Sequence, residues 1–233
     1  MKSWLKQSQT LVGLSRDLRA IRDAHLRGQR SAIQDYLAKS SSPKLQIGAS
    51  NGSLPGWLST DIRPSGEEVI YLDATKPFPF PSASFDYIHC EHMIEHISQR
   101  DGLNMLKECR RVLKPGGVLR LATPDLAFIL GLYQNASEDQ KKYVEWVTAK
   151  FLPEQTEAKA SLVINNAFRA WGHQFIYDAE NLEQALRKAG FTEIVREKYN
   201  QSRHEPLRGI EKHGLNVGNE QMAICESLVF EAA

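Results

Sequence analysis

One stretch constrains the fold more than any other, residues 45–61, with the sequence LQIGASNGSLPGWLSTD. An apolar segment stops at glycines, and a second segment ends in a carboxylate, Asp61. Glycine has no β-carbon, so a ligand can approach the backbone closely, and the amides of such a turn can bind anionic or polar groups. Asp61 is placed to accept hydrogen bonds from a ribose diol. The stretch therefore predicts a nucleotide pocket, although two glycines four residues apart also occur in ordinary turns.

Strand-like and helical or turn segments alternate after this stretch. The segments predicted as strands are 45–47, 57–61, 68–73, 85–90 and 118–122. A helix is predicted over 98–113, with Ser98 and Asp101 in a capping pattern. Only residues 53–60 separate Gly52 from Asp61, which is too short for a crossover helix, so a single helical turn is the most we expect there. The alternation predicts an α/β fold with a doubly wound, Rossmann-like, mostly parallel sheet and a ligand crevice at the carboxyl ends of its strands.

The last third of the chain is predicted to complete the sheet. A helix over 178–189 is followed by strands over 191–199 and 222–230, the last of them antiparallel. Segment 125–177 is predicted as an insertion. This insertion and the polar loop 200–221 both leave strands at their carboxyl ends, so we expect them to overhang the crevice and to recognise the substrate.

Residues 1–43 are predicted to form a separate helical arm or lid, and residues 44–233 the main domain. Residues 1–42 carry eight basic and three acidic side chains, whereas the whole chain has a net charge of +1. Apolar residues at helical spacing predict two short helices within 8–38. Their basic face is read as solvated surface, with a lid, an acidic partner or oligomer formation as alternatives.

Composition narrows the class of protein. A net charge of +1 disfavours general nucleic-acid binding. The three cysteines, Cys90, Cys109 and Cys225, lack the paired spacing of a zinc or redox motif, so reduced thiols and a cytoplasmic location are expected. Neither a signal peptide nor a membrane-spanning segment is predicted, and no membrane partner is expected.

The order of the motifs resembles the class I S-adenosylmethionine-dependent methyltransferases. The resemblance is carried by LQIGASNG, STD, YLDA, PFPFPSASFDYIHCEHMIEHI and ECRRVLKPGGVLRLATPD. It covers about residues 44–125, with weaker similarity through 230. It implies S-adenosylmethionine as the cofactor and methyl transfer as the activity.

The resemblance also implies roles for individual residues. The glycine turn would face the methionine part of the cofactor, the end of the second strand its ribose, the end of the third its adenine, and the segment after the fourth its reactive region. The matching residues are Gly48, Ala49, Ser50 and Gly52; Asp61 and Ile62; Asp73 and Ala74; and Glu91 with His92. Two positions depart from the family pattern, because Ser50 replaces a glycine and Gln46 replaces an acid.

His92 is the first candidate for a catalytic base and His173 the second, with structural roles as the alternative for both. His92, Glu95 and His96 also spell H-x-x-E-H, a zinc-protease signature. The sequence identifies no third ligand, so no metal is predicted. The chain is therefore predicted to methylate oxygen or nitrogen of a small-molecule or sugar-type acceptor. The alternative is a non-catalytic binding or scaffold protein on a degenerate methyltransferase fold.

Overall fold

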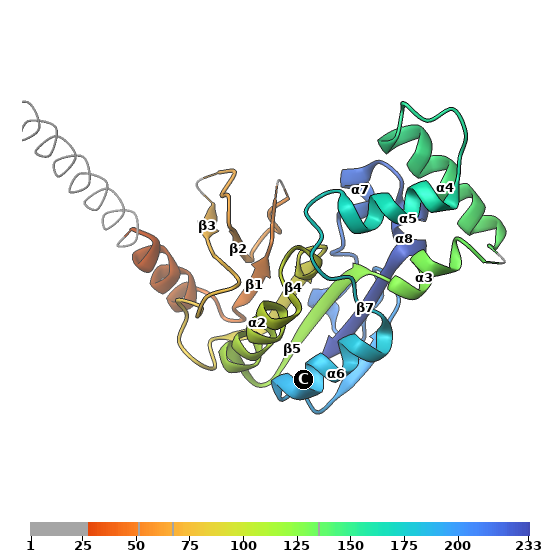
Figure 1. Cartoon of the computed structure of the whole chain (residues 1–233). Coiled ribbons are helices and arrows are strands. Elements are labelled where there is room, and N and C mark those ends of the chain that lie inside the picture. The colour runs from red at the N-terminus through yellow and green to blue at the C-terminus, as the bar shows by residue number, and fades with distance from the viewer. Residues whose placement is uncertain (1–27, 51, 67, 135) are drawn as a thin grey trace, which may run out of the picture. The chain divides into compact units, whose positions relative to one another are not determined.

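The computed structural model describes residues 28–50, 52–66, 68–134 and 136–233 (Figure 1). The chain divides into two units, residues 1–41 and 42–233. Within the first unit, residues 28–39 are helical. The helix predicted from apolar residues at positions 11–21 lies outside the described residues. The division of the chain into an arm and a main domain stays a prediction.

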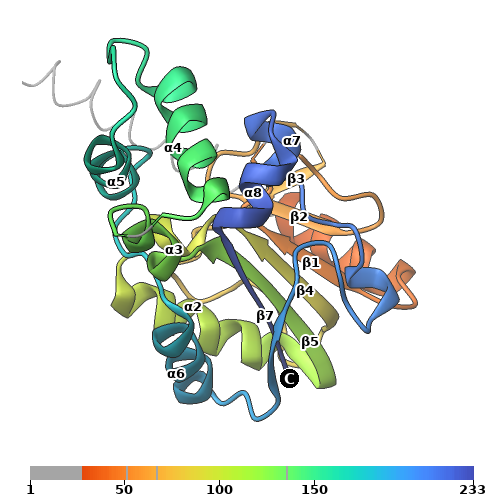
Figure 2. The same ribbon diagram turned by 90° about the vertical axis from the view of Figure 1, so that its right-hand side faces the viewer.

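The second unit is built on a seven-stranded sheet with the order β3-β2-β1-β4-β5-β7-β6 (Figures 1 and 2). The strands are β1 (Lys44–Ile47), β2 (Leu58–Asp61), β3 (Val69–Tyr71), β4 (Phe85–Glu91), β5 (Leu113–Pro124), β6 (Ile194–Glu197) and β7 (Ser227–Ala232). Strands β1 to β5 pair in parallel, and β7 is antiparallel to both β5 and β6. The Rossmann-like, mostly parallel sheet with an antiparallel last strand is confirmed.

The central strands are apolar because both of their faces are covered. Leu45, Ile88 and Leu121 are each 0% exposed, as expected for strands in the middle of a parallel sheet. Between Gly52 and Leu58 the chain makes only a turn at residues 55–56, as its short length predicts.

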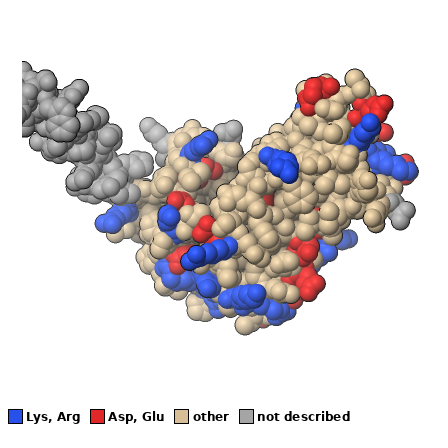
Figure 3. Space-filling view, viewed as in Figure 1, with Lys and Arg blue, Asp and Glu red and all other residues tan. Residues whose placement is uncertain are grey.

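The two helices that pack against each other beside the sheet begin and end as their sequences predict. Helix α2 (Gln99–Val112) starts at Ser98, whose hydroxyl accepts a hydrogen bond from the Asp101 amide at 3.2 Å. Helix α6 (Ala179–Ala189) starts at the cap Asp178 and ends at Gly190, whose φ of +102° is left-handed. Both helices carry basic residues in their last turns, where a positive charge stabilises the partial negative charge of the helix end. In Figure 3, basic side chains gather along the lower edge, where Figure 1 shows these helices.

The remaining helices lie in the two segments predicted to overhang the crevice. Segment 125–177 contains α3 (Leu126–Gly131), α4 (Glu138–Phe151) and α5 (Ala160–Arg169). The 3-10 helix η2 (Glu205–Leu207) and the helices α7 (His213–Val217) and α8 (Glu220–Glu226) precede β7, and the 3-10 helix η1 (Ile94–His96) follows β4. Figure 1 shows α4 and α5 next to each other at one end of the sheet.

The predicted strand over 222–230 is wrong in its first half. Residues 220–226 form α8, because the Asn219 side chain accepts a hydrogen bond from the Met222 amide at 3.2 Å and so caps a helix. Met222, Ala223 and Glu226 are buried, which is the spacing of a helix face. The strand predicted over 191–199 is confined to β6, and residues 205–207 and 213–217 of the predicted polar loop are helical.

A buried cation fastens residues 198–211 to the sheet. Arg120 on β5 is 0% exposed, and its guanidinium pairs with Glu211 and, at 2.8 Å, with Glu231 on β7. It also donates to the carbonyls of Gln201 at 2.8 Å and Lys198 at 3.0 Å. Lys212 and His213 follow Glu211 directly, so this ion cluster positions the segment that reaches the site.

Candidate active site

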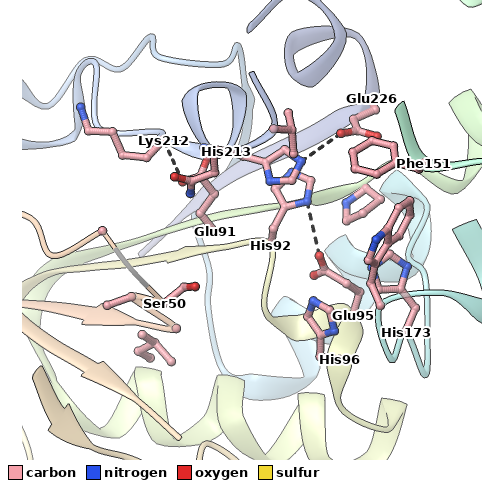
Figure 4. Close-up of a pocket in the computed structure, with 18 of the residues that line it drawn as sticks. Ser50, Glu91, His92, Glu95, His96, Phe151, His173, Lys212, His213 and Glu226 are labelled. Carbon is pink, nitrogen blue, oxygen red and sulfur yellow. Dashed lines mark hydrogen bonds and ion pairs between the residues drawn. The ribbon is translucent and has the colours of Figure 1, made fainter. Parts of the chain in front are cut away.

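A cavity of about 310 Å³ lies at the carboxyl ends of β1 and β4 (Figure 4). The turn after β1 and the segment after β4 form one part of its wall. Helix α4, residues 171–173, α7 and Glu226 at the end of α8 form the rest. The prediction that 125–177 and 200–221 overhang the crevice is therefore confirmed.

The glycine turn shapes the cavity by its backbone. Gly48 has φ +75°, and a β-carbon there would lie 2.7 Å from Met93 Cγ and 2.8 Å from Met93 Cβ. The amides of Gly48 and Ala49 both donate to the Thr60 carbonyl at 2.9 Å. The Gly52 amide donates to the Ala49 carbonyl, and the Ser50 amide donates to Asp61 Oδ2. The prediction that the amides of this turn are available to a ligand is wrong for these four, because each already donates a hydrogen bond to an oxygen of the protein.

Gln46, which stands where the family pattern has an acid, ties the turn to β2. Its Nε2 donates to the Gly52 carbonyl at 2.9 Å. Its Oε1 accepts from the Leu54 amide at 2.9 Å and from the Ser59 hydroxyl at 2.7 Å. A glutamine can do both because it carries a donor and an acceptor, whereas an ionised acid accepts only.

The residues predicted to contact a cofactor separate into two groups. Gly48, Ala49, Ser50, Gly52 and Glu91 line the cavity. The others, at the ends of β2 and β3, do not line it: Asp61, Ile62, Asp73 and Ala74.

Two of the residues outside the cavity wall are acids with partners in the protein. Asp61 accepts from the amides of Ser50 at 2.9 Å and Arg63 at 2.7 Å. Asp73 accepts from the Thr75 hydroxyl and amide, and the hydroxyl contact lowers the pKa of Asp73. Acceptor positions for a ligand remain on both oxygens of Asp61, which each accept one bond, and on Oδ2 of Asp73, since both Thr75 contacts go to Oδ1.

Glu91 holds the start of α7 against the end of β4. Its carboxylate accepts from the amides of Lys212 at 2.8 Å and His213 at 2.9 Å, and from the Tyr199 hydroxyl at 3.3 Å. Burial alone would raise the pKa of Glu91. The neighbouring His89 and the two amides outweigh burial and lower that pKa to about 2.

We expect Glu91→Gln to lower the free energy of unfolding by about 2–3 kcal/mol at pH 7, because the negative charge that strengthens these contacts is lost. Since the pKa of Glu91 is lower in the folded protein, its stabilisation is present above the pKa of the unfolded chain. The difference between wild type and variant should therefore shrink as the pH falls from about 4.5 to about 2. Urea unfolding at several pH values measures it.

Lys212→Ala is the matched control, because the Glu91 contact is with the Lys212 backbone and survives this substitution. We expect a change below about 0.5 kcal/mol for it. A loss in Glu91→Gln that is the same at all pH values would contradict the assigned role of the carboxylate.

His92 lies directly after β4, with the unusual φ of +46°. Its Nδ1 is 3.4 Å from Glu95 Oε1, its Nε2 is 3.1 Å from the Ser227 hydroxyl, and its ring stacks on His213 at 3.6 Å between centroids. Burial lowers the pKa of His92, but the carboxylates of Glu95, Glu226 and Glu91 outweigh it and raise that pKa overall.

The stacked pair of His92 and His213 continues into a second polar contact, at Glu226. His213 Nε2 is 3.1 Å from Glu226 Oε1, and the Tyr143 hydroxyl donates to the other oxygen of Glu226. Burial would raise the pKa of Glu226, but His213 and His92 lower it. Tyr143 and Glu226 could not be predicted as site residues, because they lie on α4 and α8, far from any recognisable motif.

His173 belongs to the opposite wall of the cavity. Its Nδ1 is 2.7 Å from the Ala167 carbonyl, and its ring contacts the rings of His96 and Trp171. Burial lowers the pKa of His173. Aromatic side chains complete this wall: Tyr143, Trp146, Phe151 and Trp171. Figure 4 shows Phe151 and His173 on this side and Ser50 on the other.

The fold and the cavity together define a Rossmann-like α/β protein with a ligand site at the carboxyl ends of its parallel strands. The chain belongs to a family of methyltransferase domains, whose sequence model matches residues 18–196. Among the residues that the structure describes, no helix has the length and apolar character needed to span a membrane.

Two plant proteins are similar over a short segment. The probable methyltransferase PMT8 of Arabidopsis thaliana is 45% identical over 51 residues, which is 22% of this chain and 8% of that protein. The probable methyltransferase PMT7 of the same plant is 39% identical over 56 residues, 24% of this chain and 9% of that protein. The matched segment thus spans less than a tenth of each of these relatives.

Solved structures resemble the chain over most of its length. A SAM-dependent methyltransferase from Archaeoglobus fulgidus is 14% identical with a TM-score of 0.46, covering 91% of this chain and 93% of that one. Phosphoethanolamine N-methyltransferase 2 of Haemonchus contortus, in complex with S-adenosyl-L-methionine, is 17% identical with a TM-score of 0.40, covering 88% and 52%.

Proposed function

We propose that this chain is an S-adenosylmethionine-dependent methyltransferase that methylates oxygen or nitrogen of a small-molecule or sugar-type acceptor. The observation that carries the proposal is a glycine-shaped cavity at the carboxyl ends of β1 and β4 in a member of a methyltransferase-domain family. The proposed site of action is the cytoplasm. Its support is that Cys90, Cys109 and Cys225 are all free thiols.

The lining of the cavity fits a sulfonium cofactor. Carboxylates of Glu91 and Glu226 line it, and they would attract the positive sulfur. The aromatic wall offers ring faces that also favour a cation. In the proposal, the turn from Gly48 to Gly52 and Glu91 hold the methionine part. The ribose and the adenine extend beyond the cavity in this proposal, the ribose to Asp61 and Ile62 and the adenine to Asp73 and Ala74.

When bound, the cofactor supplies an electrophilic methyl group. The cavity walls would hold the acceptor beside it and exclude water, which accounts for much of the acceleration in such transfers. His92 is the proposed general base, because Glu95 next to its Nδ1 stabilises the protonated ring. His173 is proposed to position the acceptor from the opposite wall.

Calorimetric titration with S-adenosylhomocysteine and with S-adenosylmethionine, together with melting curves recorded with and without each ligand, tests the proposal. We expect one site per chain and a higher melting temperature, because a ligand at a hundred times its dissociation constant contributes about 2.7 kcal/mol. Absence of binding to either ligand would favour the rival reading, a scaffold protein on a degenerate fold.

Within that experiment, Asp61→Ala should weaken cofactor binding by about tenfold, because the proposed ribose contact and the Ser50 anchor are lost together. Asp86→Ala is a control, since Asp86 is a surface acid that pairs with Lys114. Equal calorimetric affinity in wild type and Asp61→Ala would contradict the proposed role of Asp61.

A further inference from the structure

Three potential metal ligands come together where the segment after β4 meets the wall that carries His173. Glu95 and His96 lie on η1, and His173 follows α5. One ligand atom of each lies within 4.8 Å of the other two. Figure 4 shows Glu95 and His96 side by side, with His173 across from them. All three residues line the cavity.

The two segments that carry these ligands are fastened to each other. The amides of Gln174 and Phe175 both donate to the Glu95 carbonyl, at 2.7 and 3.2 Å. The Gln174 side chain donates to the His96 carbonyl at 2.8 Å. These bonds involve the residues next to His173, so they hold its imidazole beside η1 without occupying its nitrogens. The arrangement is thus built into the backbone, as a preformed site requires.

Glu95 is the buried member of the set. It is 0% exposed, and its Oε2 accepts from the Thr123 hydroxyl at 3.0 Å. Its Oε1 is buried without a hydrogen bond, and the nearest cationic partner is His92 Nδ1 at 3.4 Å. This contact is longer than an ordinary hydrogen bond, so the buried oxygen is only partly compensated, and coordination of a cation would complete its stabilisation.

His173 has the protonation that a metal ligand needs. Its Nδ1 lies 2.7 Å from the Ala167 carbonyl, which can only accept, so Nδ1 carries the hydrogen. The lone pair is then on Nε2. Metal-binding histidines are commonly oriented in this way, by a hydrogen bond from the other ring nitrogen to a backbone carbonyl.

A neighbouring cluster, His92, His213 and Glu226, has the same residue types but is less suited to an ion. The rings of His92 and His213 are stacked with only 5° between their planes, so their lone pairs lie in parallel planes and do not converge. His213 Nε2 already contacts Glu226, whose other oxygen accepts from Tyr143. The rings of His96 and His173, in contrast, lie at 67° to each other.

We propose that Glu95, His96 and His173 bind a divalent transition-metal ion such as Zn²⁺, with its open coordination position toward the cavity. Two histidines and one glutamate are a known catalytic zinc set, and the open position takes water or an oxygen of a small ligand. A tetrahedral ion with bonds of about 2.1 Å holds its ligand atoms about 3.4 Å apart, so only a small approach of the side chains is needed.

The proposal departs from the sequence prediction of no metal. That prediction depended on the absence of a third ligand for H-x-x-E-H. In the structure His173 lies beside Glu95 and His96, although it follows His96 by 77 residues in the sequence. His92, the first histidine of that motif, is not part of the proposed set.

The test uses the whole chain, stripped with a chelator and titrated with ZnCl₂ by calorimetry and with Co²⁺ by visible absorption. We expect one ion per chain and a cobalt spectrum typical of four or five nitrogen and oxygen ligands. His96→Gln and His173→Gln should each weaken binding by at least about 30-fold. His96 and His173 are both partly exposed, so these variants should fold, and melting curves check this.

His213→Gln is the matched control, because it removes a cavity histidine from the neighbouring cluster and should change zinc affinity by less than about threefold. The proposal is overturned if wild type binds no stoichiometric ion, or if His96→Gln and His173→Gln bind as wild type does, which would mean an adventitious ion only. It is also overturned if His213→Gln alone loses the ion. Zinc binding and S-adenosylhomocysteine binding are measured separately, so failure of one leaves the other standing.

Discussion

Replacing Arg120 with methionine is expected to lower the free energy of unfolding by about 3–5 kcal/mol, the largest stability loss we predict for a single substitution. The guanidinium is fully buried and pairs with two carboxylates, Glu211 and Glu231. Methionine matches much of the volume of arginine but leaves both acids without their cation. Because burying an unpaired charge is costly, the free energy of unfolding should fall by more than the loss of side-chain packing would account for. Urea unfolding monitored by circular dichroism measures it.

Two further variants separate charge from packing. Arg187→Met removes an exposed arginine that pairs with Glu183, and we expect a change below about 0.5 kcal/mol. Adding Glu211→Gln and Glu231→Gln to Arg120→Met should restore part of the stability, because no buried charge is then unpaired. A triple variant less stable than Arg120→Met alone would show that uncompensated charge is not the cause.

Gly48→Ala is expected to abolish measurable cofactor binding and to destabilise the fold by about 2–5 kcal/mol. Alanine disfavours the left-handed backbone, and its β-carbon would overlap Met93. Relief of that overlap must move either the glycine turn or the segment after β4, and both line the cavity. Chemical unfolding and calorimetric titration with S-adenosylhomocysteine measure the two effects.

Gly52→Ala is the control in the same turn. Gly52 is not in the left-handed region, and a β-carbon there would meet only the Ala49 carbonyl oxygen, at 3.8 Å. We expect its stability to change by less than about 1 kcal/mol. Normal stability and cofactor affinity in Gly48→Ala would show that the shape of this turn is not what forms the pocket.

The parallel sheet could be predicted because its signals are local. Apolar segments such as 45–47 end at glycine or acidic residues, and helix caps such as Ser98 and Asp178 mark their own positions. The error at residues 220–226 has a physical cause. Met222, Ala223 and Glu226 are buried on one side of a helix, whereas an apolar segment this short gives no clear period in the sequence.

The candidate site could be predicted only in part. Gly48 follows from the rule that strand ends form the crevice, Glu91 and His92 follow from the resemblance to the methyltransferase family, and all three line the cavity. Contacts between distant segments could not be predicted. Glu91 holds the amides of Lys212 and His213, and Tyr143 contacts Glu226, because the tertiary fold brings these segments together. The position of His173 beside Glu95 could not be predicted for the same reason, because the two residues are far apart in the sequence.

A crystal structure of the full chain with S-adenosylhomocysteine tests the central claim most directly, namely that the cavity at the ends of β1 and β4 is a cofactor site. The proposal predicts electron density for the ligand over Gly48 and Gly52, with its ribose at Asp61 and its sulfur toward Glu91 and His92. Ligand density elsewhere on the protein, with the cavity filled by the protein's own side chains, would contradict it.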